Sequence, residues 1–127
     1  MNKFLSGRRV LVVEDEIMIL MNIEGALADL GCEAVSVAAT VDRALALVDG
    51  ERFDLAMLDV NLDGQTSYAV ADALALRSIP FVFSTGYGLR GVESRFSDRP
   101  VLTKPYSDEE LATALASLLP ADHKGVA

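Results

Sequence analysis

Short apolar runs alternate along this chain with longer segments in which apolar residues recur every three or four positions. The run Leu55–Leu58 is wholly apolar and is followed by polar residues and by Gly64. Such a run is typical of a strand that is buried on both faces, as in a parallel sheet covered by helices. Comparable patterns predict further strands at Arg8–Asp15, Glu33–Ala38, Ile79–Thr85 and Arg99–Pro105.

Helical spacing fills the intervals between these strands. From Glu16 to Leu30 the residues Leu20, Ile23, Leu27 and Leu30 fall on one helical face, and Gly31 then provides a stop because glycine adopts the left-handed conformation at little cost. A short or distorted helix is expected within Leu89–Ser97. The remaining helices are predicted at Val41–Val48 with Thr40 as its cap, at Gln65–Leu76, and from a Ser107–Glu110 capping box to Pro120.

This alternation predicts an α/β domain with one five-stranded parallel sheet, helices on both faces and right-handed crossovers. The domain would fill residues 1–120 and leave 121–127 as a short tail. In the strand order 2-1-3-4-5, the carboxyl ends of the first, third, fourth and fifth strands neighbour one another. Ligands of such sheets bind beyond the carboxyl ends, so the residues there are the candidates for chemistry.

The composition narrows the class of protein. Lys and Arg total 11 against 19 Asp and Glu, a net charge of −8, which argues against direct binding to nucleic acid or to an anionic membrane. No apolar run approaches the roughly 20 residues of a membrane helix, and the first residues are not expected to form a signal peptide. The single Cys32 excludes an internal disulfide and fits a reducing cytosol, so we expect a cytoplasmic protein with a buried, inert thiol.

The predicted strand ends carry acids, a hydroxyl and a lysine, namely Glu14, Asp15, Asp59, Thr85 and Lys104. Three carboxylates in one crevice repel each other unless a cation joins them, and hard oxygen ligands suit Mg²⁺, or Mn²⁺. No His or Cys lies in these loops, which argues against zinc. With a metal, a lysine and a hydroxyl nearby, Asp59 could be the nucleophile of a phosphoryl transfer and form an acyl phosphate.

Each of these residues also has a simpler explanation. Asp59 could cap a turn, since Asp-x-Asn-x-Asp-Gly is good turn chemistry, and Glu14 and Asp15 could begin a helix. Thr85 could be present for its β propensity, and Lys104 could be a solvated surface residue. The functional interpretation depends on all of them standing together at the ends of neighbouring strands.

Together with Pro105, this set of residues resembles the receiver domain of two-component response regulators. The resemblance covers about all of Arg8–Leu119 and implies a flavodoxin-like receiver fold. It implies that Asp59 accepts a phosphoryl group from a histidine kinase or a phosphotransfer protein. It also implies Asp15 as direct metal ligand, Glu14 as supporting acid, Asn61 as donor of a backbone carbonyl, Thr85 and Lys104 as partners of the phosphoryl group, and a cis Lys104–Pro105 peptide.

The same resemblance implies a signalling switch rather than an enzyme in the usual sense. Phosphorylation would change binding to a downstream protein, with the contact surface on the fourth helix, fifth strand and fifth helix. We expect a monomer or weak dimer and a stand-alone receiver without a DNA-binding output, although an excised domain of a longer chain is an alternative. Two other functions stay open: a phosphate relay or sink, and a pseudo-receiver that binds partners without chemistry.

The chain departs from the family at the residue that usually couples the threonine to the outer surface. Val101 stands where receivers carry an aromatic residue three positions before the lysine. The run from Phe83 to Tyr87 resembles an atypical subset with a Phe-x-Thr-Gly motif. We therefore predict that Tyr87 or Tyr106 replaces the missing switch residue. Tyr87 and Asn61 would also flank the path of water to the phosphoryl group and set its lifetime.

A phosphatase of the haloacid-dehalogenase type is the rival from another class. That family needs an Asp-x-Asp loop after its first strand and a cap domain, whereas this strand ends in Glu14-Asp15-Glu16 without a cap-sized insertion. A nucleotide-binding P-loop is excluded because the chain contains no G-x-x-x-x-G-K. Met18, Met21 and Met57 lie within apolar elements and are predicted to be core residues.

Overall fold

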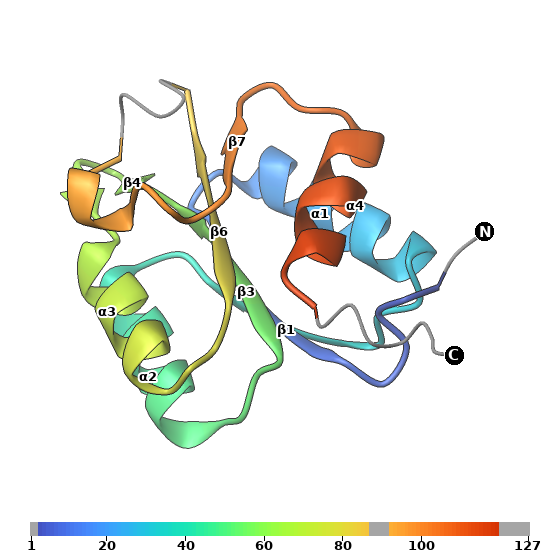
Figure 1. The fold of residues 1–127 in the computed structure, drawn as a ribbon, viewed down its shortest axis with the longest axis horizontal. Coiled ribbons are helices and arrows are strands. Elements are labelled where there is room, and N and C mark those ends of the chain that lie inside the picture. Colours follow the sequence, from blue (N-terminus) through green and yellow to red (C-terminus); the bar gives the residue numbers. More distant parts are fainter. Residues whose placement is uncertain (1–2, 87–91, 120–127) are drawn as a thin grey trace.

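A parallel sheet runs through the middle of the molecule, which a computed structural model describes for residues 3–86 and 92–119. Its strand order is β2-β1-β3-β6-β7, the order 2-1-3-4-5 predicted for the main strands (Figure 1). The register pairs every neighbour in parallel. The strands are β1 (Arg9–Val13), β2 (Ala34–Ala38), β3 (Leu55–Asp59), β6 (Phe81–Thr85) and β7 (Val101–Thr103).

Helices cover both faces of this sheet, as the apolar strands require. Figure 1 shows α1 and α4 on one side and α2 and α3 on the other. Alternate residues of β1 enter different cores: Val10 and Val12 pack towards α1 and α4, whereas Leu11 and Val13 pack towards α2 and α3. The helices are α1 (Ile17–Asp29), α2 (Val41–Gly50), α3 (Tyr68–Leu76) and α4 (Asp108–Ser117).

Three predicted helix ends are confirmed by hydrogen bonds and by backbone conformation, whereas α2 ends at Gly50 and not at the predicted Val48. The Thr40 hydroxyl accepts a hydrogen bond from the backbone N–H of Arg43 at 3.1 Å, which caps α2. Ser107 and Glu110 form the reciprocal capping box of α4. Gly31 follows α1 with φ +91°, and a Cβ there would lie 2.6 Å from the Ser6 hydroxyl, so both conformation and space favour glycine.

The predicted helix at Gln65–Leu76 is wrong at its start, because α3 begins only at Tyr68. The preceding residues form a two-stranded antiparallel hairpin, β4 (Asn61–Leu62) with β5 (Gln65–Thr66). Asp63 and Gly64 adopt φ angles of 52° and 87°, the left-handed pair that a tight two-residue hairpin requires. The Asp-Gly dipeptide was therefore a hairpin signal in the sequence.

The prediction that Met18 and Met21 are core residues is also wrong. Their side chains are 71% and 60% exposed, whereas Met57 in β3 is buried as predicted. Apolar residues occur on all sides of α1, and the sheet buries only the face that carries Ile23 and Leu27. Cys32 is buried as predicted, and this burial raises the pKa of its thiol.

Only part of the uncertain segment Leu89–Ser97 can be compared with the structure. Its described portion contains one 3₁₀ turn, η2 (Ser94–Phe96). Tyr87, Pro120 and the predicted tail lie outside the described residues. Among the helices that are described, none is long and apolar enough to cross a membrane.

Candidate functional site

The sheet topology collects the predicted site residues at one edge. Asp59 is the last residue of β3 and Thr85 the last of β6, while Glu14 and Asp15 follow β1 directly. Lys104 follows β7, and its backbone N–H donates to the Thr85 carbonyl at 2.9 Å. Parallel strands place all these carboxyl ends on the same side, so residues far apart in the chain become neighbours.

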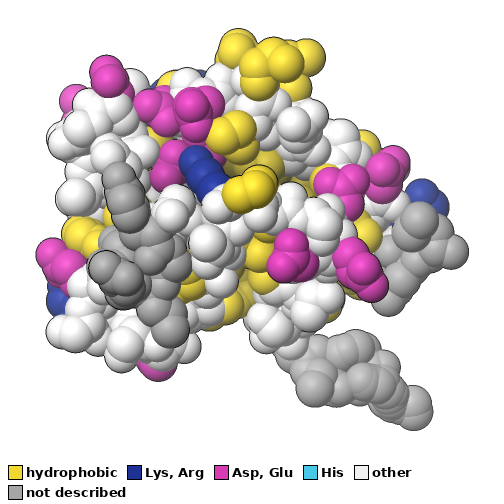
Figure 2. All heavy atoms as spheres, turned by 90° about the horizontal axis from the view of Figure 1, so that it is seen from above, with side chains coloured by type: hydrophobic (Ala, Val, Ile, Leu, Met, Phe, Trp, Pro, Cys, Tyr) yellow, Lys and Arg dark blue, Asp and Glu magenta, His cyan; other side chains and the backbone are white. Residues whose placement is uncertain are grey.

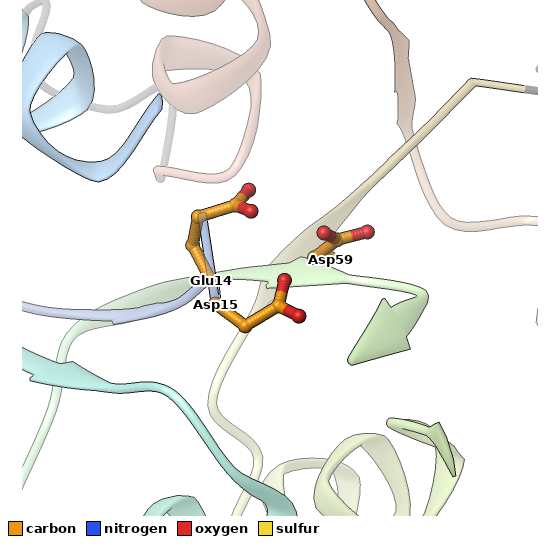
Figure 3. Close-up of side chains that lie close together, drawn as sticks. All are labelled: Glu14, Asp15 and Asp59. Carbon is orange, nitrogen blue, oxygen red and sulfur yellow. The ribbon is translucent and has the colours of Figure 1, made fainter. Parts of the chain in front are cut away.

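The three acids form one cluster. Carboxylate oxygens of Glu14, Asp15 and Asp59 all lie within 4.8 Å of one another, and Figure 3 shows them grouped at the ends of β1 and β3. Glu14 and Asp59 are buried, with 1% and 6% of their surface exposed, and Asp15 is half-buried. Such a concentration of buried negative charge is unfavourable unless cations neutralise it.

Lys104 supplies one of those positive charges. Its ammonium Nζ donates to Asp59 Oδ2 at 3.0 Å, and it lies 3.3 Å from Glu14 Oε1. Burial, the largest single influence, lowers the pKa of Lys104, but its hydrogen bond to Asp59 and the charges of Asp59 and Glu14 outweigh burial and leave the pKa raised. The lysine is therefore firmly protonated in this site.

One lysine does not balance the cluster. Burial, followed by the charge of Asp59, raises the pKa of Glu14 from 4.5 to about 7, although the Glu16 N–H and Lys104 act in the opposite direction. Glu14 Oε1 is also buried without a hydrogen-bond partner among the described residues. The donor set consists of hard carboxylate oxygens, with the Asn61 backbone close by in sequence, and this set fits Mg²⁺ or a similar divalent cation.

Asn61 and Thr85 are positioned by the strands that contain them, β4 and β6. The Asn61 backbone N–H donates to Asp59 Oδ1 at 3.3 Å, and its side-chain oxygen accepts from the Gly64 N–H at 2.8 Å. The Asn61 side chain thus stabilises the hairpin turn beside the site. Thr85 is buried at the end of β6.

The predicted switch residues do not lie together. Val101 is half-buried and packs against the core on the α2 and α3 side of the sheet, whereas Tyr106 packs against the core on the α1 and α4 side. The Tyr106 hydroxyl is buried with no hydrogen-bond partner in the described residues. Tyr87 is outside the described range.

Two nearby residues were missed by the sequence analysis. Glu16 Oε1 lies 3.8 Å from Lys104 Nζ, and its place directly after Asp15 in an acidic run was the available signal. Tyr68 stacks on Phe96 and contacts Phe83, two residues before Thr85, and its hydroxyl accepts a hydrogen bond from the Glu93 N–H at 2.9 Å. No local sequence pattern distinguishes Tyr68 from an ordinary core aromatic.

The family follows from a comparison of the whole domain. The family model that describes the response regulator receiver domain matches residues 10–116 of this chain. This chain belongs to the response regulator receiver family. The Lys104–Pro105 peptide is cis, as the resemblance implied.

The receiver also resembles individual proteins. A probable transcriptional regulator, ycf27 of Cyanophora paradoxa, is 34% identical over 91% of this chain and 49% of its own length. The transcriptional regulatory protein PdtaR of Mycobacterium tuberculosis is 31% identical over 85% of this chain and 55% of its own. The receiver thus spans about half the length of these curated relatives.

Among solved structures, the solution structure of SdrG from Sphingomonas melonis Fr1 is 48% identical to this receiver. It covers 94% of this chain and 100% of the SdrG chain with a TM-score of 0.80. The anti-anti-sigma factor PhyR from Bartonella quintana is 25% identical over 87% of this chain and 48% of its own, with a TM-score of 0.74. These likenesses confirm the flavodoxin-like receiver fold.

Proposed function

We propose that this receiver is a phosphorylation-dependent signalling switch whose phosphoryl acceptor is Asp59. The observation that carries the proposal is the hydrogen bond of 3.0 Å from Lys104 to Asp59 beside two further carboxylates. A carboxylate between an ammonium and a cluster that could hold a metal is suited to nucleophilic attack on phosphorus. Membership of the receiver family supports the same chemistry.

In the proposed reaction, a carboxylate oxygen of Asp59 attacks the phosphorus of a phosphohistidine or of acetyl phosphate. The new O–P bond forms while the bond to the leaving group breaks, and the imidazole or acetate leaves with that electron pair. Lys104 then pairs with one phosphoryl oxygen, and the Thr85 hydroxyl donates to another. Mg²⁺ or Mn²⁺, held by Asp15, Asp59 and the Asn61 carbonyl with Glu14 in support, would neutralise charge on the phosphoryl oxygens.

We also propose that the phosphodonor protein docks over the start of α1. Ile17, Met18 and Met21 are exposed there, and the same helix borders a groove of about 720 Å³ that runs to Lys104 and Pro105. Figure 2, which looks onto the end of the sheet where the strands finish, shows hydrophobic side chains beside acidic ones and a basic one. A donor must bring its phosphoryl group to Asp59, so an apolar surface next to the site suits its docking.

The experiment that tests the acceptor is intact mass spectrometry after incubation with acetyl phosphate and Mg²⁺. We expect the mass of one phosphoryl group to be added, and we expect Asp59→Asn or chelation of the metal to abolish the gain. Asp63→Asn is the matched control, because Asp63 is an exposed aspartate in the adjacent turn. An adduct that survives in Asp59→Asn would refute Asp59 as the acceptor.

The docking surface has a test of its own. With a histidine kinase that phosphorylates the wild type, Met18→Gln combined with Met21→Gln should slow phosphotransfer about tenfold or more, because apolar anchors dominate interfaces. Labelling by acetyl phosphate should stay unchanged, since that donor needs no protein contact. Leu76→Gln on α3, where the leucine is 85% exposed, is the control. Equal transfer rates for all variants would contradict the proposed surface.

The downstream step distinguishes a switch from a relay or sink. A switch changes the affinity for a protein partner while the phosphoryl group stays on Asp59, whereas a relay or sink loses the group to another histidine or to water. The name of PhyR as an anti-anti-sigma factor supports a protein as the kind of output partner for a similar receiver. The cytoplasmic location, the monomeric or weakly dimeric state, the stand-alone organisation and the non-enzymatic role stay predictions.

A further inference from the structure

Two buried polar atoms in the segments that follow β1 and β7 lack a hydrogen-bond partner among the described residues. One is the acceptor Glu14 Oε1, and the other is the Tyr106 hydroxyl, which can donate. A third such atom, in Ser67, belongs to the start of α3. Glu14 Oε1 does form an ion pair with Lys104 at 3.3 Å. Because a buried polar group without a partner is unfavourable, the Tyr106 donor and this acceptor are candidates for each other once that ion pair weakens.

Tyr106 is placed to reach this site. It lies two residues after Lys104 and just before the α4 capping residue Ser107, and its ring packs against the core between α1 and α4. Burial, followed by the charge of Glu14, raises the pKa of Tyr106 to about 12, so the hydroxyl stays protonated and able to donate. Tyr106 also lines the groove that runs along α1 to Lys104, whose Nζ lies 3.3 Å from Glu14 Oε1.

The ammonium group of Lys104 lies beside Glu14 in this structure. Its Nζ lies 3.3 Å from Glu14 Oε1 and donates to Asp59 at 3.0 Å. When Lys104 pairs with a phosphoryl group on Asp59, Glu14 loses part of its nearest positive charge while it remains buried. A hydrogen bond from another donor would then stabilise the buried Glu14 carboxylate most strongly.

We propose that Tyr106 is a positioning residue whose hydroxyl donates a hydrogen bond to Glu14 Oε1 when Lys104 turns to the phosphoryl group. This inference rests on the proposed function. The hydroxyl keeps the Glu14 carboxylate oriented for its supporting role next to Asp15 and Asp59. Phenylalanine at this position would pack equally well but could not donate.

A double-mutant cycle tests this pairing without any phosphoryl group. Lys104→Gln removes the ammonium, so the Tyr106 hydroxyl should pair with Glu14 in that variant at pH 8. Adding Tyr106→Phe should then lower the folding equilibrium constant about tenfold, the effect of losing a hydrogen bond to a charged group. In the wild-type background, where the hydroxyl has no partner among the described residues, Tyr106→Phe should leave this constant unchanged or raise it. Tyr68→Phe is the control, since the Tyr68 hydroxyl lies at Glu93.

A spectroscopic measurement gives an independent answer. With ¹³Cζ-labelled tyrosine, the Tyr106 resonance should shift between the wild type and Lys104→Gln, and between the wild type before and after phosphorylation by acetyl phosphate. If Lys104→Gln does not fold, the phosphorylated wild type supplies the comparison. Equal effects of Tyr106→Phe in both backgrounds, or an unmoved resonance, would overturn the pairing.

The failure of the proposed function would look different. A wild type that takes up no phosphoryl group from acetyl phosphate would refute the acceptor role of Asp59, whereas the cycle with Lys104→Gln would still decide about Tyr106. If labelling occurs and the cycle shows coupling, Tyr106→Phe should also shorten the lifetime of the phosphorylated protein several-fold. An unchanged lifetime would refute the positioning role.

Discussion

Two clusters in this molecule place one basic side chain between two acids, and they differ mainly in their access to water. On the surface, Arg95 binds Asp72 at 2.6 Å and Glu93 at 2.9 Å, and all three side chains are about half exposed. At the end of β3, Lys104 lies between Asp59 and Glu14, whose side chains are only 8% and 1% exposed.

The comparison shows how burial changes the electrostatics of a common arrangement. Water screens the charges of the surface cluster, and Arg95 also lies over the ring of Phe96 at 4.3 Å, so this cluster joins η2 to α3. In the buried cluster, water has little access to Glu14 and Asp59, and the half-buried Asp15 adds a third carboxylate beside them. Burial, followed by the charge of Asp59, raises the pKa of Glu14, and the cluster favours an additional cation.

The largest effect should come from removing the central charge of the buried cluster. Lys104→Met leaves Glu14 and Asp59 without their nearest cation, and we expect the free energy of unfolding to fall by about 3 kcal/mol without metal. Mg²⁺ should restore much of this loss because it neutralises the same acids. Urea unfolding with and without Mg²⁺ measures both effects, with exposed Lys3→Met as control. A variant as stable as the wild type would show that water screens this cluster too.

A somewhat smaller effect should appear in the pH dependence of stability. The pKa of Glu14 is raised from 4.5 to about 7 on folding, so the folded protein binds the proton more tightly. The free energy of unfolding should therefore fall as the pH rises from about 4.5 through about 7, by at most about 3 kcal/mol from this group. Below and above this window, the contribution of Glu14 should be constant.

Glu14→Gln is the variant that isolates this pH effect. It should flatten the fall in stability between about pH 4.5 and 7, whereas exposed Glu24→Gln should leave it unchanged. Mg²⁺ should also reduce the fall, because it stabilises the ionised carboxylate. If the free energy of unfolding falls just as steeply in Glu14→Gln, another titrating group causes the fall.

The smallest effect should come from the surface cluster. Asp72→Asn removes one partner of Arg95, but Glu93 and the Phe96 ring remain in contact with it. We expect only a slight decrease in melting temperature, which added salt should diminish. Thermal unfolding at low and high salt measures it. A loss as large as that of Lys104→Met would remove the distinction between the two clusters.

Two errors of the sequence analysis had signals in the chain that could have been used. The Asp63-Gly64 pair predicts a two-residue hairpin, which would have moved the start of α3 to its observed place at Tyr68. Met18 and Met21 were predicted to be buried only because they lie in an apolar helix, although they fall outside the face of Ile23 and Leu27 that the sheet covers.

Local sequence patterns were sufficient to predict the main strands and helices and several of their ends. Apolar runs predict the five strands of the main sheet, Thr40 and Ser107 cap their helices, and the acids stand directly after β1 and β3. These features are local, since each depends on residues within a few positions of one another. The distance of 3.0 Å between Lys104 and Asp59, which are 45 residues apart in the chain, results from the packing of the whole sheet. The tertiary structure also decided which carboxylates lose their water, because burial depends on how distant segments pack and not on local sequence.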